Sequence, residues 1–438
     1  MLTPNANSDR DGRRLAIWIE WFFGLAVVAG LCGLIRNVVV DGYLPDPFLH
    51  SKADTFMDWY NPAYWANNSG TYSIWQSIYP PFAFVFVRIF SNPMCYSSRE
   101  YMRECDPTGI VVVCVLTVLN FFLVFMAFRK VDKATALPRA LAVGLGFPVL
   151  YAWERGNLNI PCFTAFILGF GNLLKSARLR TLFAAFSLNF KPYLVLALTG
   201  RILKRKWIWL EWCALWFFAV YAASYAIFGA GDPMSIVQNM MGFEHLPDVD
   251  LISFTTTYSA LLQILKLPLP FIEFLGSDPV EKVEAIIPVL MFAGTVGVIP
   301  CLAYAVLRPN VCTREQASAL VLIFFMSIST APGGYSLQFA LFLIFFDKWQ
   351  GPGRILVMIG SYLWCIPYDY PIATIFDDYG FSFLGQREVS FPLALNIGQL
   401  LRPGFLLLIE YGLVGVIAGN IIRDIRDLRN ERLARVAS

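Results

Sequence analysis

Two aspartates, Asp54 and Asp58, lie in an aromatic-rich polar segment between two very apolar stretches. They are four residues apart, so they share one face if this segment is helical. A carboxylate at a membrane surface can act as a general base that takes a proton from an attacking hydroxyl. One acid suffices for this, and Asp54 is favoured because its neighbours Ala53 and Thr55 are small, whereas Trp59 crowds Asp58. The alternative is an interfacial loop whose acids are merely solvated.

A second polar segment, residues 153–159, separates two apolar runs and contains Glu154, Arg155, Asn157 and Asn159. A charge at the centre of a membrane helix costs about 2.5 to 3.5 kcal/mol, so such residues need partners or a wet cavity. Arg155 is suited to bidentate binding of a phosphate, and Asn157 or Asn159 to sugar hydroxyls. We place Glu154 among the candidate substrate contacts. The alternative is a Glu154–Arg155 turn at the level of the lipid headgroups.

Basic residues flank the stretch 181–199 on both sides, and about twenty residues are too few for two full spans. We therefore predict a hairpin of two half-helices that meet near residues 189–192, with Pro192 at the first position of the second. Lys191 would then lie at the tip, where a helix N-terminus and an ammonium together attract a lipid phosphate. The alternative is an interfacial lysine that reaches the headgroups.

Weaker candidates follow in the second half of the chain. We include His245 and Tyr258 as substrate contacts and Arg402 as a phosphate ligand, although His245 could equally be an ordinary loop residue. Asp377 and Asp378 could bind a divalent cation, but no spacing of ligands elsewhere strengthens that reading. We predict no metal site.

The composition identifies a polytopic membrane protein. Of its 438 residues 57% are hydrophobic and only 15% are charged, against about a quarter in soluble domains. The net charge of +3 is too small to indicate nucleic-acid binding. No Walker A sequence, G-x-G-x-x-G loop or G-x-S-x-G elbow occurs, so we expect no nucleotide and no other cofactor.

Ten apolar runs approach the length needed to span a membrane. We predict an all-α fold of about 10 to 12 transmembrane helices with a half-helix hairpin and interfacial helices. The runs are residues 15–34, 110–128, 137–152, 158–174, 207–228, 285–307, 317–329, 337–346, 355–366 and 405–421.

The Lys and Arg clusters between these runs all fall on one side of the membrane if both termini are cytoplasmic. This predicts a multi-pass protein of the inner (plasma) membrane with a basic cytoplasmic tail, residues 422–438. The segments 36–109, 230–283 and 367–403 then lie outside and carry most of the unusual polar residues. Cys95 and Cys105, ten residues apart in the first outer segment, could form a disulfide there.

These motifs together resemble the GT-C glycosyltransferases, and most closely glycosyltransferase family 87. The similarity covers about the first half of the chain: a loop aspartate, then Tyr79-Pro80-Pro81-Phe82, a Gly156-Asn157-Leu158-Asn159 turn between spans, and Lys191-Pro192 in a short helix pair. Family members commonly have Gly-Gln-x-Asn at that turn. The second half agrees only in hydropathy and in one polar outer turn.

The resemblance implies transfer of a sugar from a polyprenyl-phosphate donor to a glycan or glycolipid acceptor on the extracytoplasmic face. Arg155 and Lys191 would stabilise the phosphate of the leaving group, so that no metal is required. The rings of Trp59, Tyr60, Trp65 and Trp75 would stack on sugars, with Tyr79 also at the substrate.

Two other classes of protein remain open. A transporter or flippase of lipid-linked saccharides should expose comparable polar sites on both faces, whereas the cytoplasmic loops here are short and merely basic. An O-antigen polymerase or ligase usually relies on arginine-rich outer loops, and arginine is scarce in residues 230–283.

Overall fold

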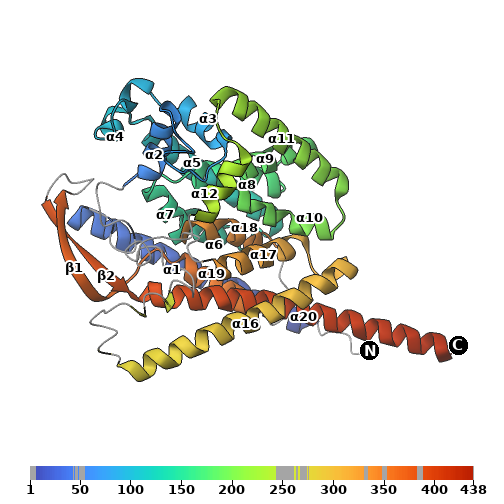
Figure 1. The fold of residues 1–438 in the computed structure, drawn as a ribbon. Helices are drawn as coiled ribbons and strands as arrows, with labels where there is room; N and C mark the ends of the chain where they lie inside the picture. The colour runs from blue at the N-terminus through green and yellow to red at the C-terminus, as the bar shows by residue number, and fades with distance from the viewer. Residues whose placement is uncertain are drawn as a thin grey trace.

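A computed structural model describes residues 6–42, 44, 48, 55–242, 261–262, 265–266, 274, 276–329, 334–347, 353–381 and 388–437. Figure 1 shows a mainly helical protein in which the long helices α16 (Ser277–Leu307) and α20 (Ile397–Ala437) cross below most of the other helices. The remaining residues are not discussed structurally.

Six apolar helical stretches in the described ranges are long enough to cross a membrane, so the chain is a membrane protein. Helix α5 shows why: Val111, Val115 and Phe122 are exposed on a face that only lipid would cover, while Val113 and Val124 are buried in the bundle. The six lie in α1 (Ala6–Asp41), α5 (Thr108–Val131), α6 (Ala136–Leu145) with α7 (Phe147–Glu154), α11 (Trp207–Phe228), α16 (Ser277–Leu307) and α20 (Ile397–Ala437). The predicted basic tail is the C-terminal part of α20.

The other predicted spans form helices shorter than a full span, so six of the 10 to 12 expected transmembrane helices have that length in the described ranges. Helix α18 has nine residues, or about 14 Å at 1.5 Å per residue, and every one of them is buried. Helix α18 thus lies in the interior of the bundle, which explains its almost continuous hydrophobicity. The short apolar helices are α8 (Asn159–Phe170), α17 (Arg314–Ile328), η4 (Gly334–Leu337) with α18 (Gln338–Phe346), and α19 (Gly353–Cys365).

The predicted break at Lys191 is confirmed. Helix α9 (Ala177–Phe190) ends there, Lys191 is extended, and Pro192 is the first residue of η2 (Pro192–Leu198), which leads into α10 (Thr199–Leu203). Arg178 and Arg201, near the two outer ends, lie over Trp212 and Trp209 of the same part of α11. The segment therefore turns back on itself, and its re-entrant course in a bilayer stays a prediction.

The described residues are mainly helical, as predicted, and one antiparallel hairpin of β1 (Pro371–Phe381) and β2 (Glu388–Asn396) adds a feature that the all-α prediction lacks. It projects to the left of α20 in Figure 1. Its second strand alternates Val389, Phe391, Leu393 and Leu395 with smaller or polar residues, a period of two that favours a strand over a helix.

The first segment that is predicted to lie outside forms a cap of short helices: α2 (Met57–Asn67), α3 (Pro81–Ile89), η1 (Pro93–Tyr96) and α4 (Met102–Cys105). The predicted disulfide between Cys95 and Cys105 is formed and joins η1 to α4. Asp106 strengthens this junction, because its backbone carbonyl accepts from Tyr60 and its carboxylate from Tyr96. Further along lie α12 (Pro233–Gly242) and η3 (Pro309–Val311).

A buried cluster of charged side chains joins three helices that are distant from one another in sequence: α1, α6 and α19. Arg139 Nε and Nη2 donate to the two carboxylate oxygens of Glu20 at 2.7 and 2.8 Å, and both side chains are only 3% exposed. Tyr362 Oη donates to the same carboxylate at 3.1 Å, and Arg354 lies 3.4 Å from it. Breaking such a pair typically costs 3 to 5 kcal/mol because one charge is left buried.

Candidate active site

The carboxylate of Asp58, in the first turn of α2, is held by the turn between α7 and α8. Arg155 Nε and Nη2 donate to its two oxygens at 3.0 and 3.1 Å, and Asn157 Nδ2 donates at 2.6 Å. The backbones are joined as well, since the N–H groups of Phe56 and Asp58 donate to the carbonyls of Glu154 and Arg155. Two segments that the sequence separates by 97 residues thus form one unit.

The turn itself has a local sequence cause. Helix α7 ends at Glu154, and Gly156 follows with φ of +63°, a left-handed conformation that favours glycine. Asn157 lies two residues before α8, and its Oδ1 accepts from the backbone N–H of Asn159, the first residue of that helix. A Cβ on Gly156 would lie 3.0 Å from both Cα and the carbonyl oxygen of Phe56.

Gly156→Ala should therefore separate α2 from the turn. The left-handed conformation alone costs an L-residue roughly 1 to 2 kcal/mol, and the new methyl group would meet backbone that cannot rotate away. We expect a lower melting temperature of the purified protein, which differential scanning fluorimetry in detergent would measure. Gly415→Ala in α20, where no atom lies within 4 Å of the added Cβ, is the matched control. Equal melting temperatures for the two variants would contradict this account.

Tyr79 and Lys191 extend the cluster. Lys191 Nζ donates to Tyr79 Oη at 3.3 Å, lies 4.5 Å from the centre of its ring and 5.9 Å from the ring of Tyr335. Burial and the charge of Asp58 raise the pKa of Tyr79, while Arg155 and a hydrogen bond from Asn157 oppose that shift, so Tyr79 stays a neutral phenol. Lys191 is 9% exposed, and no ion pair joins it to any residue that the structure describes.

A buried amide pair lies beside this cluster. Asn159 is fully buried, and neither polar atom of its side chain has a hydrogen-bond partner within the described ranges. Gln338 Nε2 donates to the backbone carbonyl of Asn159 at 3.3 Å, while Gln338 Oε1 is buried without a partner. Unpaired buried amides are costly, so these atoms indicate a site for polar groups of a ligand or for water.

Sequence reasoning did not identify Gln338 or Tyr335. Tyr335 lies in η4, and Gln338 is the first residue of α18, one of the most apolar helices. The available signal was a glutamine and a tyrosine placed where a glycine-rich polar turn enters a buried helix. A polar residue in that position needs a partner from another element.

The structure corrects the roles of two aromatic rings. Trp59 and Tyr60 have no exposed surface, Trp59 packs against Phe86 and Gly109, and Tyr60 donates to the carbonyl of Asp106. No face of either ring is open to a sugar here, because the apolar face of α2 is the one that packs on α3 and α5. The prediction that they stack on substrate is therefore wrong for this conformation.

Other predicted rings and charges have different surroundings. Trp75 is half-buried, stacks on Trp65 and lies under the guanidinium of Arg99, whose carbon is 4.6 Å from its ring centre. Glu154 is buried and its carbonyl supports Phe56.

Arg402 does not join the candidate site. Its guanidinium pairs with Asp369 at 3.0 Å, both side chains are under 5% exposed, and it stacks on Phe147. The predicted phosphate ligand thus has a buried carboxylate as its partner, which is a correction.

Asp54, His245 and Tyr258 lie outside the described residues, and only the backbone of Asp377 and Asp378 is described. No group of three or more His, Cys, Asp or Glu side chains that could hold a metal occurs in the described ranges.

The cluster as described combines one carboxylate, two cationic side chains, a phenol and two asparagines. Its formal charge is +1, and Lys191 is the cation that has no carboxylate partner there. Such a set can hold an anion of one phosphate and present amide groups to hydroxyls. No protein-family model, curated protein or solved structure matches the chain.

Proposed function

We propose that this protein is a membrane glycosyltransferase that transfers a sugar from a polyprenyl-phosphate donor to a glycan or glycolipid acceptor. The observation that carries the proposal is the convergence of Arg155 and Lys191 on Tyr79, beside Asp58, from segments distributed over residues 58 to 191. A buried ammonium with no carboxylate partner in the described structure calls for an anion, and a lipid-borne phosphate would supply it.

The proposed reaction is a single in-line displacement. The acceptor oxygen forms a bond to the anomeric carbon of the donor sugar while the bond from that carbon to the phosphate oxygen breaks. The polyprenyl phosphate leaves with the bonding electron pair, and its growing negative charge lies at Lys191 and Arg155, where fixed cations lower the barrier most. The proton of the acceptor hydroxyl passes to a carboxylate of the loop that contains Asp54 and Asp58.

The two acids would then have different tasks. The carboxylate of Asp58 accepts three hydrogen bonds from Arg155 and Asn157, so both of its oxygens already have partners. We assign it the positioning of Arg155. Asp54 remains the proposed general base, and the unpaired amides of Asn159 and Gln338 would bind sugar hydroxyls.

Purified protein in detergent, incubated with a panel of polyprenyl-phosphate sugars, should release free polyprenyl phosphate together with a glycosylated acceptor. Mass spectrometry of the lipid extract would detect both products. A transporter or flippase would instead move the intact lipid-linked saccharide across a proteoliposome membrane without cleaving it. Movement without cleavage would overturn the proposal in favour of that alternative.

A further inference from the structure

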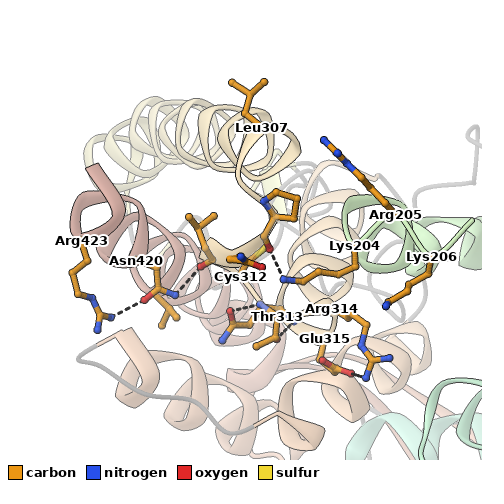
Figure 2. Close-up of a pocket in the computed structure, with 15 residues that line it drawn as sticks. Lys204, Arg205, Lys206, Leu307, Cys312, Thr313, Arg314, Glu315, Asn420 and Arg423 are labelled. Atoms are coloured by element: carbon orange, nitrogen blue, oxygen red, sulfur yellow. Dashed lines mark hydrogen bonds and ion pairs between the residues drawn. The ribbon is translucent and has the colours of Figure 1, made fainter. Parts of the chain in front are cut away.

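A cavity of about 940 Å³ lies at the junction of α10, α16, η3, α17 and α20. Figure 2 shows basic side chains of the α10–α11 turn on one side of it and Asn420 and Arg423 of α20 on the other. Its charged lining residues are Lys204, Arg205, Lys206, Arg314, Glu315 and Arg423.

The lining is strongly cationic. It contains five Lys or Arg side chains and one carboxylate, that of Glu315, which pairs with Arg314 at 3.2 Å. Lys204 donates to the carbonyl of Pro309, and Arg423 donates to Asn420 Oδ1 at 2.6 Å, so two more of the cations are oriented by uncharged groups. The formal charge of the lining is +4, which would repel itself without an anion.

This cavity lies at the opposite end of the bundle from the candidate active site. Tyr193, two residues after Lys191, stacks on Phe325 near the end of α17, whereas Ser318 near its start is hydrogen-bonded to the backbone of Ala197 and Gly200. Helix α17 has 15 residues, so the two sites are about 20 Å apart along it. In the orientation predicted from the Lys and Arg clusters, the cavity faces the cytoplasmic leaflet.

One exposed apolar side chain lines the cavity, and others adjoin its lining residues in sequence. Leu307 lines it and is 75% exposed, Ile208 and Ile422 are 74% and 58% exposed, and Trp207 begins the adjacent helix. A pocket for a soluble anion has no need of such a border. A lipid molecule, with a charged head and acyl chains beside it, matches both parts.

We propose that this cavity binds the phosphate headgroup of an anionic phospholipid, with the acyl chains along α11, α16 and α20. The cytoplasmic leaflet is rich in anionic lipid, and basic pockets between membrane helices are suited to such headgroups. Zwitterionic lipids would add a cation to a site that already has an excess of four.

Binding of fluorescent phosphatidylglycerol to the full chain in detergent, followed by anisotropy, tests this. The triple variant Lys204→Gln, Arg314→Gln, Arg423→Gln should bind about a hundredfold more weakly, because each basic residue contributes about fivefold. The control variant removes three positive charges from the part of α20 that lies beyond the cavity: Arg426→Gln, Arg429→Gln and Arg432→Gln. It should bind the probe like the parent. Unlabelled phosphatidylglycerol should displace the probe, and phosphatidylcholine should not.

Equal binding by the triple variant and its control would overturn the proposal, because the cations would then serve only membrane orientation. Displacement by inorganic phosphate as effective as that by phosphatidylglycerol would also overturn it, in favour of a soluble phosphate ligand. Displacement by an acidic peptide alone would indicate a protein partner instead. Lys206→Gln with Arg423→Gln, both exposed side chains, covers the case in which the triple variant does not fold, and should bind about 25-fold more weakly.

Discussion

Asp54→Asn is expected to slow sugar transfer by about 10²- to 10⁴-fold, because an amide cannot take the proton of the attacking hydroxyl. The neighbouring Asp58 is a weaker candidate, since both of its oxygens already accept hydrogen bonds from Arg155 or Asn157. Substitution by asparagine keeps the size and much of the hydrogen bonding, so the protein should stay folded. Initial rates of polyprenyl phosphate release, with size-exclusion elution as the check on folding, measure this.

Asp58→Asn separates positioning from proton transfer. If Asp58 acts by holding Arg155, its substitution should add little once Arg155 has been replaced by methionine, and a double-mutant cycle would show strong coupling. If Asp58→Asn lowers the transfer rate as much in the Arg155→Met protein as in the parent, and Asp54→Asn keeps a rate near the parent's, Asp58 is the base. Full activity of both asparagine variants would exclude this loop as the catalytic site and favour the transporter.

Lys191→Met should lower the transfer rate by about 10²- to 10³-fold, the usual cost of removing one fixed donor from a developing anion. The same variant should not lose thermal stability in the absence of donor, since it removes a charge that is 9% exposed and has no ion-pair partner in the described structure. Rates of transfer and melting curves with and without polyprenyl phosphate measure the two effects separately.

Lys282→Gln, an exposed lysine of α16, is the control for loss of one positive charge. It should keep both the rate and the stabilisation by polyprenyl phosphate. If Lys191→Met has a much lower melting temperature than the parent without ligand, and Lys191→Arg does not restore that temperature, this lysine has a structural role. If polyprenyl phosphate raises the melting temperature of Lys191→Met as much as that of the parent, Lys191 does not contact the phosphate.

Local rules explain what could be predicted from the sequence. Residues 207–228 are predicted as one helix and form one, because a largely apolar run lies between Lys206 and Gly229, and Gly229 ends it with φ of +75°. The break at Lys191 follows from Pro192, whose missing N–H suits the start of a helix. The disulfide follows from two cysteines close together in a polar segment.

Partners distant in sequence could not be predicted. Residues 155 and 157 were identified as polar groups that need partners, but nothing local indicates that Asp58 is that partner. The same limit explains Arg402, which was predicted to bind phosphate and instead pairs with Asp369. The hairpin of β1 and β2 was missed because its length and apolar content resemble those of an interfacial segment, and only the two-residue alternation distinguishes it.

The ion cluster around Glu20 has a consequence for biosynthesis. Glu20 leaves the ribosome 119 residues before Arg139 and 342 residues before Tyr362. At about 5 to 20 residues per second, α1 exists for roughly 6 to 24 seconds before its first partner is made. During that interval it carries a carboxylate that lipid does not tolerate well. Helix α1 is therefore fully compatible with the bilayer only once α6 arrives, so the first third of the chain integrates as one cotranslational unit.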